Sequence, residues 1–198
     1  MKDLIKYGFI LCVICLAAAG LLASINLLTA GRILAQAQSE ELASLKEVMP
    51  QAESFEAVKD DSGQTLYYNA FDKDKNIIGY AFKASGRGYS SVIETMVGML
   101  TDGTISGIKV LSQNETPGLG ARICEIQEDR TIFDIGKKEV EPSLPKKPWF
   151  QEQFINKKLD NLNEVQAITG ATISSKAVID SVEQRALEIQ ELIGKNAK

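Results

Sequence analysis

A turn rich in hydroxyl groups lies near the carboxyl end of this sequence, directly before a stretch with helical periodicity that begins near Lys176. The turn reads Thr169-Gly170-Ala171-Thr172-Ile173-Ser174-Ser175. The first amides of a helix lack partners within the helix and carry the positive end of its dipole, so this turn suits an anion such as a phosphate. Gly170 and Ala171 are small enough to let a ligand approach the backbone. A turn of this kind more often serves only as a helix cap, so other segments must support the binding interpretation.

Two further segments combine glycines with polar groups, and each lies at the end of a predicted strand or at the start of a predicted helix. They are Gly86-Arg87-Gly88-Tyr89 and Glu115-Thr116-Pro117-Gly118-Leu119-Gly120. Loops held by a rigid scaffold commonly carry binding residues. Each segment alone is also ordinary turn chemistry. Together with the hydroxyl-rich turn, they predict one shared pocket.

The composition excludes several classes of function. The chain has 198 residues, no histidine and a formal net charge of −4. Without imidazole, zinc hydrolysis through histidine ligands and Ser-His-Asp catalysis are excluded. The acidic balance and the lack of a basic stripe argue against nucleic acid as a partner. Cys12 and Cys15 lie in an apolar stretch and, with Cys124, predict structural thiols rather than a disulfide framework or a metal site.

The N-terminal region predicts a retained membrane anchor. From Tyr7 to Ala30 no side chain is charged, and a helix of this length extends about 36 Å, enough to cross a hydrocarbon core of ~30 Å. A cleaved signal peptide is the alternative, but its apolar region normally spans only ~7–15 residues. Lys2 and Lys6 precede the segment, so the N-terminus is expected in the cytoplasm and the main domain outside. The expected division is a transmembrane anchor over 1–32, a stalk helix over 33–50 and an extracytoplasmic domain over 51–198.

The remaining pattern predicts an α+β domain with an antiparallel sheet. Apolar residues at helical spacing extend the stalk to Val48, where Pro50 ends it. The predicted strands are Thr65–Phe71, Ile77–Lys83, Val92–Leu100 and Ile105–Leu111, with loops at 72–76, 85–88 and 102–103. Pro142, Pro145 and Pro148 predict an irregular passage. The final helix is expected to pack on the sheet through an apolar face, with the helices on one side. That face comprises Val178, Val182, Ala186, Ile189 and Ile193.

Over nearly its whole length the chain resembles the RnfG family, which carries the FMN-binding domain of the Rnf complex, an ion-translocating ferredoxin:NAD oxidoreductase. The C subunit of the sodium-pumping NADH:quinone oxidoreductase shares that domain. The resemblance rests on the single N-terminal anchor, the Gly-x-Gly-Tyr loop, the Val97-Gly98 strand, the 115–120 segment, Trp149-Phe150 and the Thr-Gly-Ala-Thr turn. The turn, in this order and after this anchor, is the most specific of these features.

The resemblance implies FMN joined through its phosphate to the side-chain oxygen of Thr172. In the family a dedicated flavin transferase installs this group outside the cytoplasmic membrane, which agrees with the topology expected from charge. Family members often carry an acidic residue three positions before the motif, where this chain has Gln166. That departure puts the strength of recognition by the transferase in doubt, although the acceptor itself is present.

Physical reasoning on the residues assigns roles to the other candidates that fit this attachment. Backbone amides from Thr172 to Ser175 are expected to stabilise the phosphate, with added hydroxyl donors from the same turn. The 115–120 segment is expected to border the flavin ring, with Tyr89 packed nearby; Arg87 contacts the cofactor or is only solvated. The candidate cofactor-binding residues are Thr172, Thr169, Gly170, Ala171, Ser174, Ser175, Glu115, Thr116, Gly118, Leu119, Gly120 and Tyr89, and no metal ligand is expected.

The implied function is that of an electron-carrying subunit without independent catalytic activity. It would relay electrons between ferredoxin and NAD through neighbouring iron–sulfur and flavin subunits, in a complex that moves Na+ or H+. A membrane-anchored flavin-binding module for sensing, or for another reductase, is the alternative. A hydrolase built on Ser175-Lys176 is disfavoured, because adjacent helical residues point in different directions and the chain offers no other base.

Overall fold

The computed structural model describes residues 2–60, 63–126 and 147–196. The chain divides into two compact units, Met1–Ala43 and Ser44–Lys198. Of the three prolines that predict an irregular passage, Pro142 and Pro145 lie outside the described residues. Pro148 lies inside them and directly precedes a short helix.

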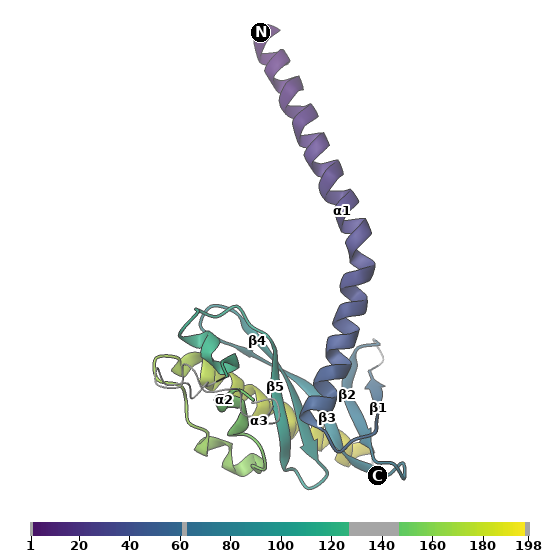
Figure 1. The fold of residues 1–198 in the computed structure, drawn as a ribbon, viewed down its shortest axis with the longest axis vertical. Helices are drawn as coiled ribbons and strands as arrows, with labels where there is room; N and C mark the ends of the chain where they lie inside the picture. Colours follow the sequence, from purple (N-terminus) through teal and green to yellow (C-terminus); the bar gives the residue numbers. More distant parts are fainter. Residues whose placement is uncertain (1, 61–62, 127–146, 197–198) are drawn as a thin grey trace, which may run out of the picture. The chain divides into compact units, whose positions relative to one another are not determined.

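The first unit consists of most of helix α1, which runs without interruption over Lys2–Val48 (Figure 1). No glycine or proline occurs between Arg32 and Val48, so nothing breaks the helix where the anchor was expected to give way to the stalk. The apolar side chains from Ile5 to Leu34 are exposed. Within the described part of the chain, α1 is the one helix long and apolar enough to cross a membrane.

The second unit contains a five-stranded antiparallel sheet in the order β1-β2-β3-β4-β5 (Figure 1). Its strands are β1 Ser54–Lys59, β2 Thr65–Phe71, β3 Ile77–Arg87, β4 Val92–Leu100 and β5 Ile105–Ser112. The structure confirms the predicted α+β class and the bounds of β2 and β4. The prediction missed β1, and the loop predicted over 85–88 was wrong because β3 continues to Arg87, paired with Val92 of β4.

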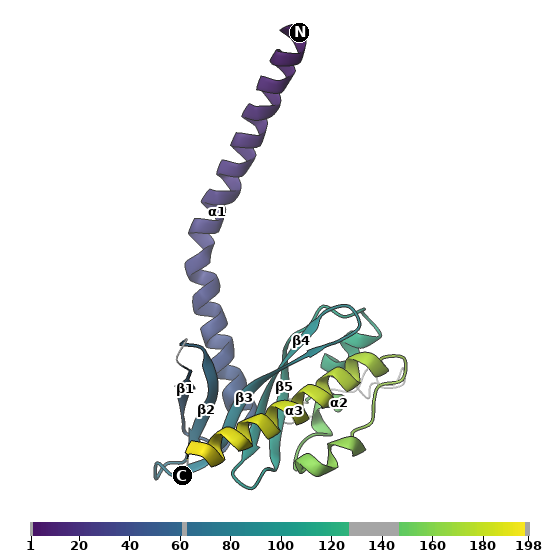
Figure 2. The same ribbon diagram turned by 180° about the vertical axis from the view of Figure 1, so that it is seen from behind.

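Helices cover both faces of this sheet. Helix α3, Thr172–Asn196, crosses one face and packs Val178, Val182 and Ile189 into the larger buried cluster (Figure 2). The last turn of α1 packs on the other face, where Val48 belongs to the smaller cluster. The expectation of helices on one side only was therefore wrong. Adjacent strand residues point to opposite faces, so Val97 joins the α3 side and Met96 the α1 side.

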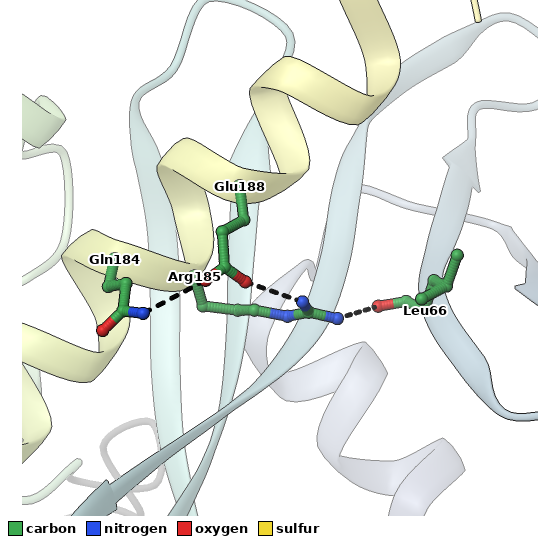
Figure 3. A network of polar contacts seen from close by, with 4 residues as sticks. All are labelled: Leu66, Gln184, Arg185 and Glu188. Carbon is green, nitrogen blue, oxygen red and sulfur yellow. Dashed lines mark hydrogen bonds and ion pairs between the residues drawn. The ribbon is translucent and has the colours of Figure 1, made fainter. Parts of the chain in front are cut away.

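An arginine ties the second half of α3 to strand β2. The Nη2 atom of Arg185 donates to the carbonyl oxygen of Leu66 at 3.2 Å, and its Nη1 atom lies 2.9 Å from the Glu188 carboxylate (Figure 3). The pairing of β1 with β2 shifts register at this point and skips Leu66. This irregularity in the β1–β2 pairing leaves the Leu66 carbonyl available to the arginine.

Three short helices place the segment that leads into α3. They are η1 Gly120–Cys124, α2 Trp149–Glu152 and η3 Leu159–Glu164. Ile123, Phe150 and Leu162 anchor one helix each in the larger cluster. The side-chain amide of Gln153 also accepts from the Gln166 backbone N–H through its oxygen and donates to the Gln166 carbonyl through its nitrogen. These two bonds fix the backbone before the Thr-Gly-Ala-Thr turn.

One buried hydroxyl in the sheet has no hydrogen-bond partner among the described residues. It belongs to Thr95, which is fully buried in β4 between Ile93 and Val97. We expect Thr95→Val to raise the free energy of unfolding by about 1 kcal/mol, because the substitution removes an unsatisfied polar group at nearly constant volume. Urea unfolding of the full chain in detergent, followed through the single tryptophan, measures the change.

The control is Thr65→Val at an exposed position of β2, where the effect should stay within about 0.5 kcal/mol. If Thr95→Val loses stability while Thr65→Val is neutral, the Thr95 hydroxyl makes a hydrogen bond in the folded protein.

Candidate functional site

The three segments singled out in the sequence meet around one cavity of about 540 Å³. One wall comes from the loop after β3, a second from the connection between β5 and η1, and a third from the first turn of α3. Its lining residues are Tyr89, Glu115, Thr116, Leu119, Gly120, Gly170, Ala171, Thr172, Ile173 and Ser174. Tyr89, Leu119 and Ile173 are large exposed side chains, so much of the cavity wall is apolar.

The Glu115 carboxylate holds the three segments together. Its Oε1 atom accepts from the amides of Ser90 at 3.0 Å and Ser91 at 2.9 Å and from the Ser91 hydroxyl at 3.2 Å. Its Oε2 atom accepts from the Tyr89 amide at 3.1 Å and from the Ser174 hydroxyl at 2.6 Å. Glu115 is only 5% exposed. One side chain therefore joins the loop after β3 to the first turn of α3.

Two glycines leave the space that this carboxylate occupies. A Cβ on Gly88 would lie 2.6 Å from Glu115 Oε1, and a Cβ on Gly120 would lie 2.7 Å from Glu115 Oε2 and 2.6 Å from Ser174 Oγ. These distances are shorter than real Cβ contacts. Glycine is therefore required at these positions by the Glu115 cluster, which consists of the Glu115 carboxylate and its hydrogen-bond donors. It is not only a feature of a turn.

The hydrogen bonds of the Glu115 cluster also keep the Glu115 carboxyl group ionised. Burial favours the neutral acid, but the hydrogen bonds from the Ser174 hydroxyl and from the Ser91, Ser90 and Tyr89 amides outweigh it and lower the pKa of Glu115 from 4.5 to about 2. The side chain therefore carries a full negative charge throughout the physiological pH range.

The start of α3 presents hydrogen-bond donors, in contrast to the negatively charged Glu115. The helix begins at Thr172, four residues earlier than the sequence predicted, and its first intrahelical bond runs from the Ser175 amide to the Ala171 carbonyl at 2.9 Å. The amides of 172–174 therefore precede the first amide that donates within the helix, and they carry the positive end of the dipole. Thr172 is exposed and lines the cavity. This arrangement suits an anionic group bound at or joined to Thr172.

Several candidate residues lie outside the cavity lining. The Ser175 hydroxyl is fully buried and accepts from the Ile168 amide at 3.0 Å, which closes the turn. Gly118 has a positive φ of 73° and shapes the connection between β5 and η1. Thr169 borders a second cavity of about 270 Å³ together with Gln166 and Trp149. Arg87 is exposed at the end of β3.

Sequence reasoning missed three residues of the site. Ile173 lines the cavity, although an apolar residue in a hydroxyl-rich turn gave no reason to single it out. Ser90 and Ser91 donate to Glu115, and the only available signal was their position directly after the Gly-x-Gly-Tyr loop. The role of Glu115 as a buried acceptor also had no signal, since its partners are mainly backbone amides distant in sequence.

Two models of known protein families match this chain. The family model of the FMN-binding domain matches residues 88–187, and that of the RnfG N-terminal region matches residues 1–48. The first of these includes all three walls of the cavity. Strands β1, β2 and β3 lie between the two matches.

Relatives extend the similarity to nearly the whole chain. The G subunit of the ion-translocating oxidoreductase complex of Methanosarcina acetivorans is 32% identical over 194 residues, covering 91% of this chain and 92% of the relative. The G subunit of the Na(+)-translocating ferredoxin:NAD(+) oxidoreductase complex of Acetobacterium woodii is 32% identical over 205 residues, covering 96% of this chain and 94% of the relative.

Among solved structures, the crystal structure of Shewanella oneidensis NqrC matches 71% of this chain and 66% of that chain, with a TM-score of 0.40 and 20% identity. The assignment rests on the family models and the two relatives. The chain belongs to the RnfG family, the G subunits of ion-translocating oxidoreductase complexes, and residues 88–187 match the FMN-binding domain.

Proposed function

We propose that this chain carries FMN as a phosphoester on the side-chain oxygen of Thr172 and serves as an electron-carrying subunit of a membrane-bound, ion-translocating ferredoxin:NAD oxidoreductase. The observation that carries the proposal is the position of Thr172. It is an exposed hydroxyl at the first turn of α3, on the wall of the cavity inside the FMN-binding domain. The names of the relatives support the assignment to the complex.

The cavity has the size and chemistry that FMN requires. Its volume of about 540 Å³ falls within the range of ~300–1,000 Å³ that is usual for small-molecule sites. Leu119, Ile173 and Tyr89 supply apolar surface for a flat ring. The amides of 172–174 supply donors for a phosphate that keeps one negative charge after esterification. Bound FMN supplies reversible electron uptake and release, which none of the side chains here can provide.

Residues of the chain bind the phosphate, position the cavity walls and leave the attachment site accessible. The Ser174 hydroxyl donates to Glu115, and the Ser175 hydroxyl is fully buried, where it accepts from the Ile168 amide. The amides at the helix start are therefore the phosphate donors. Glu115 fixes the cavity walls relative to one another. Because Thr172 is exposed, the active site of a separate flavin transferase has access to its hydroxyl before the ring is in place.

The attachment site is tested by a matched pair of threonine substitutions. The wild-type chain, Thr172→Ala and Thr169→Ala are each expressed with a flavin transferase, denatured, and examined for ultraviolet-excited fluorescence in a gel. Only covalent flavin survives this treatment. We expect fluorescence in the wild type and in Thr169→Ala and complete loss in Thr172→Ala. A fluorescent Thr172→Ala chain, or a dark wild type, would refute the proposed attachment.

We also propose that the FMN-binding domain lies outside the cytoplasmic membrane, with α1 as a single anchor and the N-terminus inside. Positive charges at Lys2 and Lys6 support this orientation. The domain is then positioned to exchange electrons with neighbouring membrane subunits and to meet the transferase.

Labelling with a membrane-impermeant maleimide tests the orientation. The three native cysteines are first replaced by alanine. One new cysteine is then introduced by Asp74→Cys, in the exposed turn between β2 and β3, or by Lys6→Cys, before the apolar segment. We expect Asp74→Cys to react in intact spheroplasts and Lys6→Cys to react only after lysis. The reverse pattern would place the domain in the cytoplasm.

A further inference from the structure

Among the residues that the structure describes, no cationic side chain neutralises the buried charge of Glu115. Its five hydrogen bonds come from three amides and two hydroxyls, all of which are neutral. The cationic side chains on the segments around it are Arg87, Arg122 and Lys176, and all three are exposed. In the part of the chain that the structure describes, none of them forms an ion pair with Glu115.

This unneutralised charge lies in the wall of the cavity. Glu115 is only 5% exposed and lines the cavity together with Thr172. Water screens a charge in such a position poorly, so its field acts more strongly on a neighbouring group than the field of an exposed carboxylate does. The five neutral donors keep the group ionised and orient it, but they leave its net charge in place.

We propose that Glu115 is an electrostatic residue that lowers the reduction potential of the cofactor in this cavity. The inference rests on the proposed function, since the cofactor is FMN joined to Thr172. Reduction of the flavin ring by two electrons with uptake of one proton adds one negative charge to it. A fixed negative charge beside the ring raises the free energy of the reduced form relative to the oxidised form, so the flavin becomes a stronger electron donor.

A potentiometric titration of the flavin-loaded full chain in detergent tests the inference. The wild type, Glu115→Gln and Glu188→Gln are reduced with dithionite in the presence of a dye of known potential. Glu188→Gln removes the same charge from an exposed position on α3 that does not line the cavity. We expect Glu115→Gln to favour flavin reduction by about tenfold in the equilibrium constant against the dye, a positive shift of roughly 30 mV for a two-electron couple. The control should not shift.

A second variant separates charge from local packing. Ser174→Ala removes the 2.6 Å hydrogen bond but keeps the carboxylate, so the charge is less stabilised by donors and the potential should move in the negative direction. A positive shift in Glu115→Gln together with a negative shift in Ser174→Ala supports the inference. Shifts of the same sign in the two variants overturn it, because a loosened loop would then explain the result. A negative shift or no shift in Glu115→Gln also overturns it, because the charge would then not lower the potential.

The two proposals fail in different ways. A wild type without covalent flavin defeats the proposed function before any potential is measured. Flavin attached to the wild type and to Glu115→Gln with equal potentials defeats only the inference about Glu115. If Glu115→Gln does not fold, Ser174→Ala decides: a negative shift supports the inference, and a zero or positive shift overturns it.

Discussion

Replacing Glu115 by alanine is expected to lower the free energy of unfolding by about 3 kcal/mol at pH 7. The substitution removes the acceptor for five hydrogen bonds and leaves the buried Ser174 hydroxyl without its partner. Water can replace the carboxylate at the more exposed amides of Tyr89 and Ser90, which limits the loss. Urea unfolding of the flavin-free full chain in detergent, followed through Trp149 fluorescence, measures the difference.

The loss should depend on pH in a specific direction. The pKa of Glu115 is lowered from 4.5 to about 2 in the folded chain, so its ionisation stabilises the fold above pH 4.5, and that stabilisation disappears as the pH falls toward 2. The difference between wild type and Glu115→Ala should therefore shrink over this interval. The exposed Glu183→Ala provides the control, with an effect within about 0.5 kcal/mol. A difference that stays constant from pH 7 to pH 3 would contradict the lowered pKa.

Substituting Gly120 by alanine should also destabilise the Glu115 cluster, because the added methyl group would clash with Glu115 and Ser174. The new Cβ would lie within 2.8 Å of three atoms, Ser174 Oγ, Glu115 Oε2 and Glu115 Cβ, all in buried side chains. Overpacking of this kind costs about 1–3 kcal/mol, and displacement of the Ser174–Glu115 hydrogen bond adds to it. We expect a loss of about 3 kcal/mol in the same urea assay, together with a lower yield of covalent flavin, because the cavity walls separate.

Gly194→Ala is the matched control for this substitution. Gly194 lies near the end of α3, and an added Cβ there meets no atom within 4 Å. Alanine favours a helix more than glycine does, so this variant should keep or slightly increase stability. If Gly120→Ala is as stable as Gly194→Ala, the close packing around Glu115 does not exist in solution.

Regular periodicity explains which parts of the fold could be predicted. Strands β2 and β4 alternate or concentrate apolar residues between clear turn signals, and the structure confirms their bounds. Strand β1 was missed because it is an edge strand with mostly exposed or half-buried residues, so its apolar pattern is weak. The end of β3 was missed because Gly86 suggested a loop. In the structure Gly86 remains in the strand and lets α3 approach, since a Cβ there would lie 2.2 Å from the Ala177 carbonyl oxygen.

The convergence of the three segments on one cavity could be predicted, but the hydrogen bonds within it could not. The residues with unusual turn chemistry do converge, because each lies at the end of an element that the sheet and α3 position. The hydrogen-bond assignments required the three-dimensional structure. Ser174 donates to a residue 59 positions earlier, and Ser175 serves the backbone of its own turn. Periodicity in a sequence carries no information about such pairings between distant segments.

Mass spectrometry of the tryptic peptide from Leu159 to Lys176 tests the central claim most directly. The peptide contains Thr169, Thr172, Ser174 and Ser175, so all hydroxyl candidates of the turn are compared in one fragment. After expression with a flavin transferase, the account predicts an increment equal to FMN less one water, and fragmentation that places it on Thr172. An unmodified peptide from a preparation treated in this way, or an increment on any of the other three residues, would contradict the account.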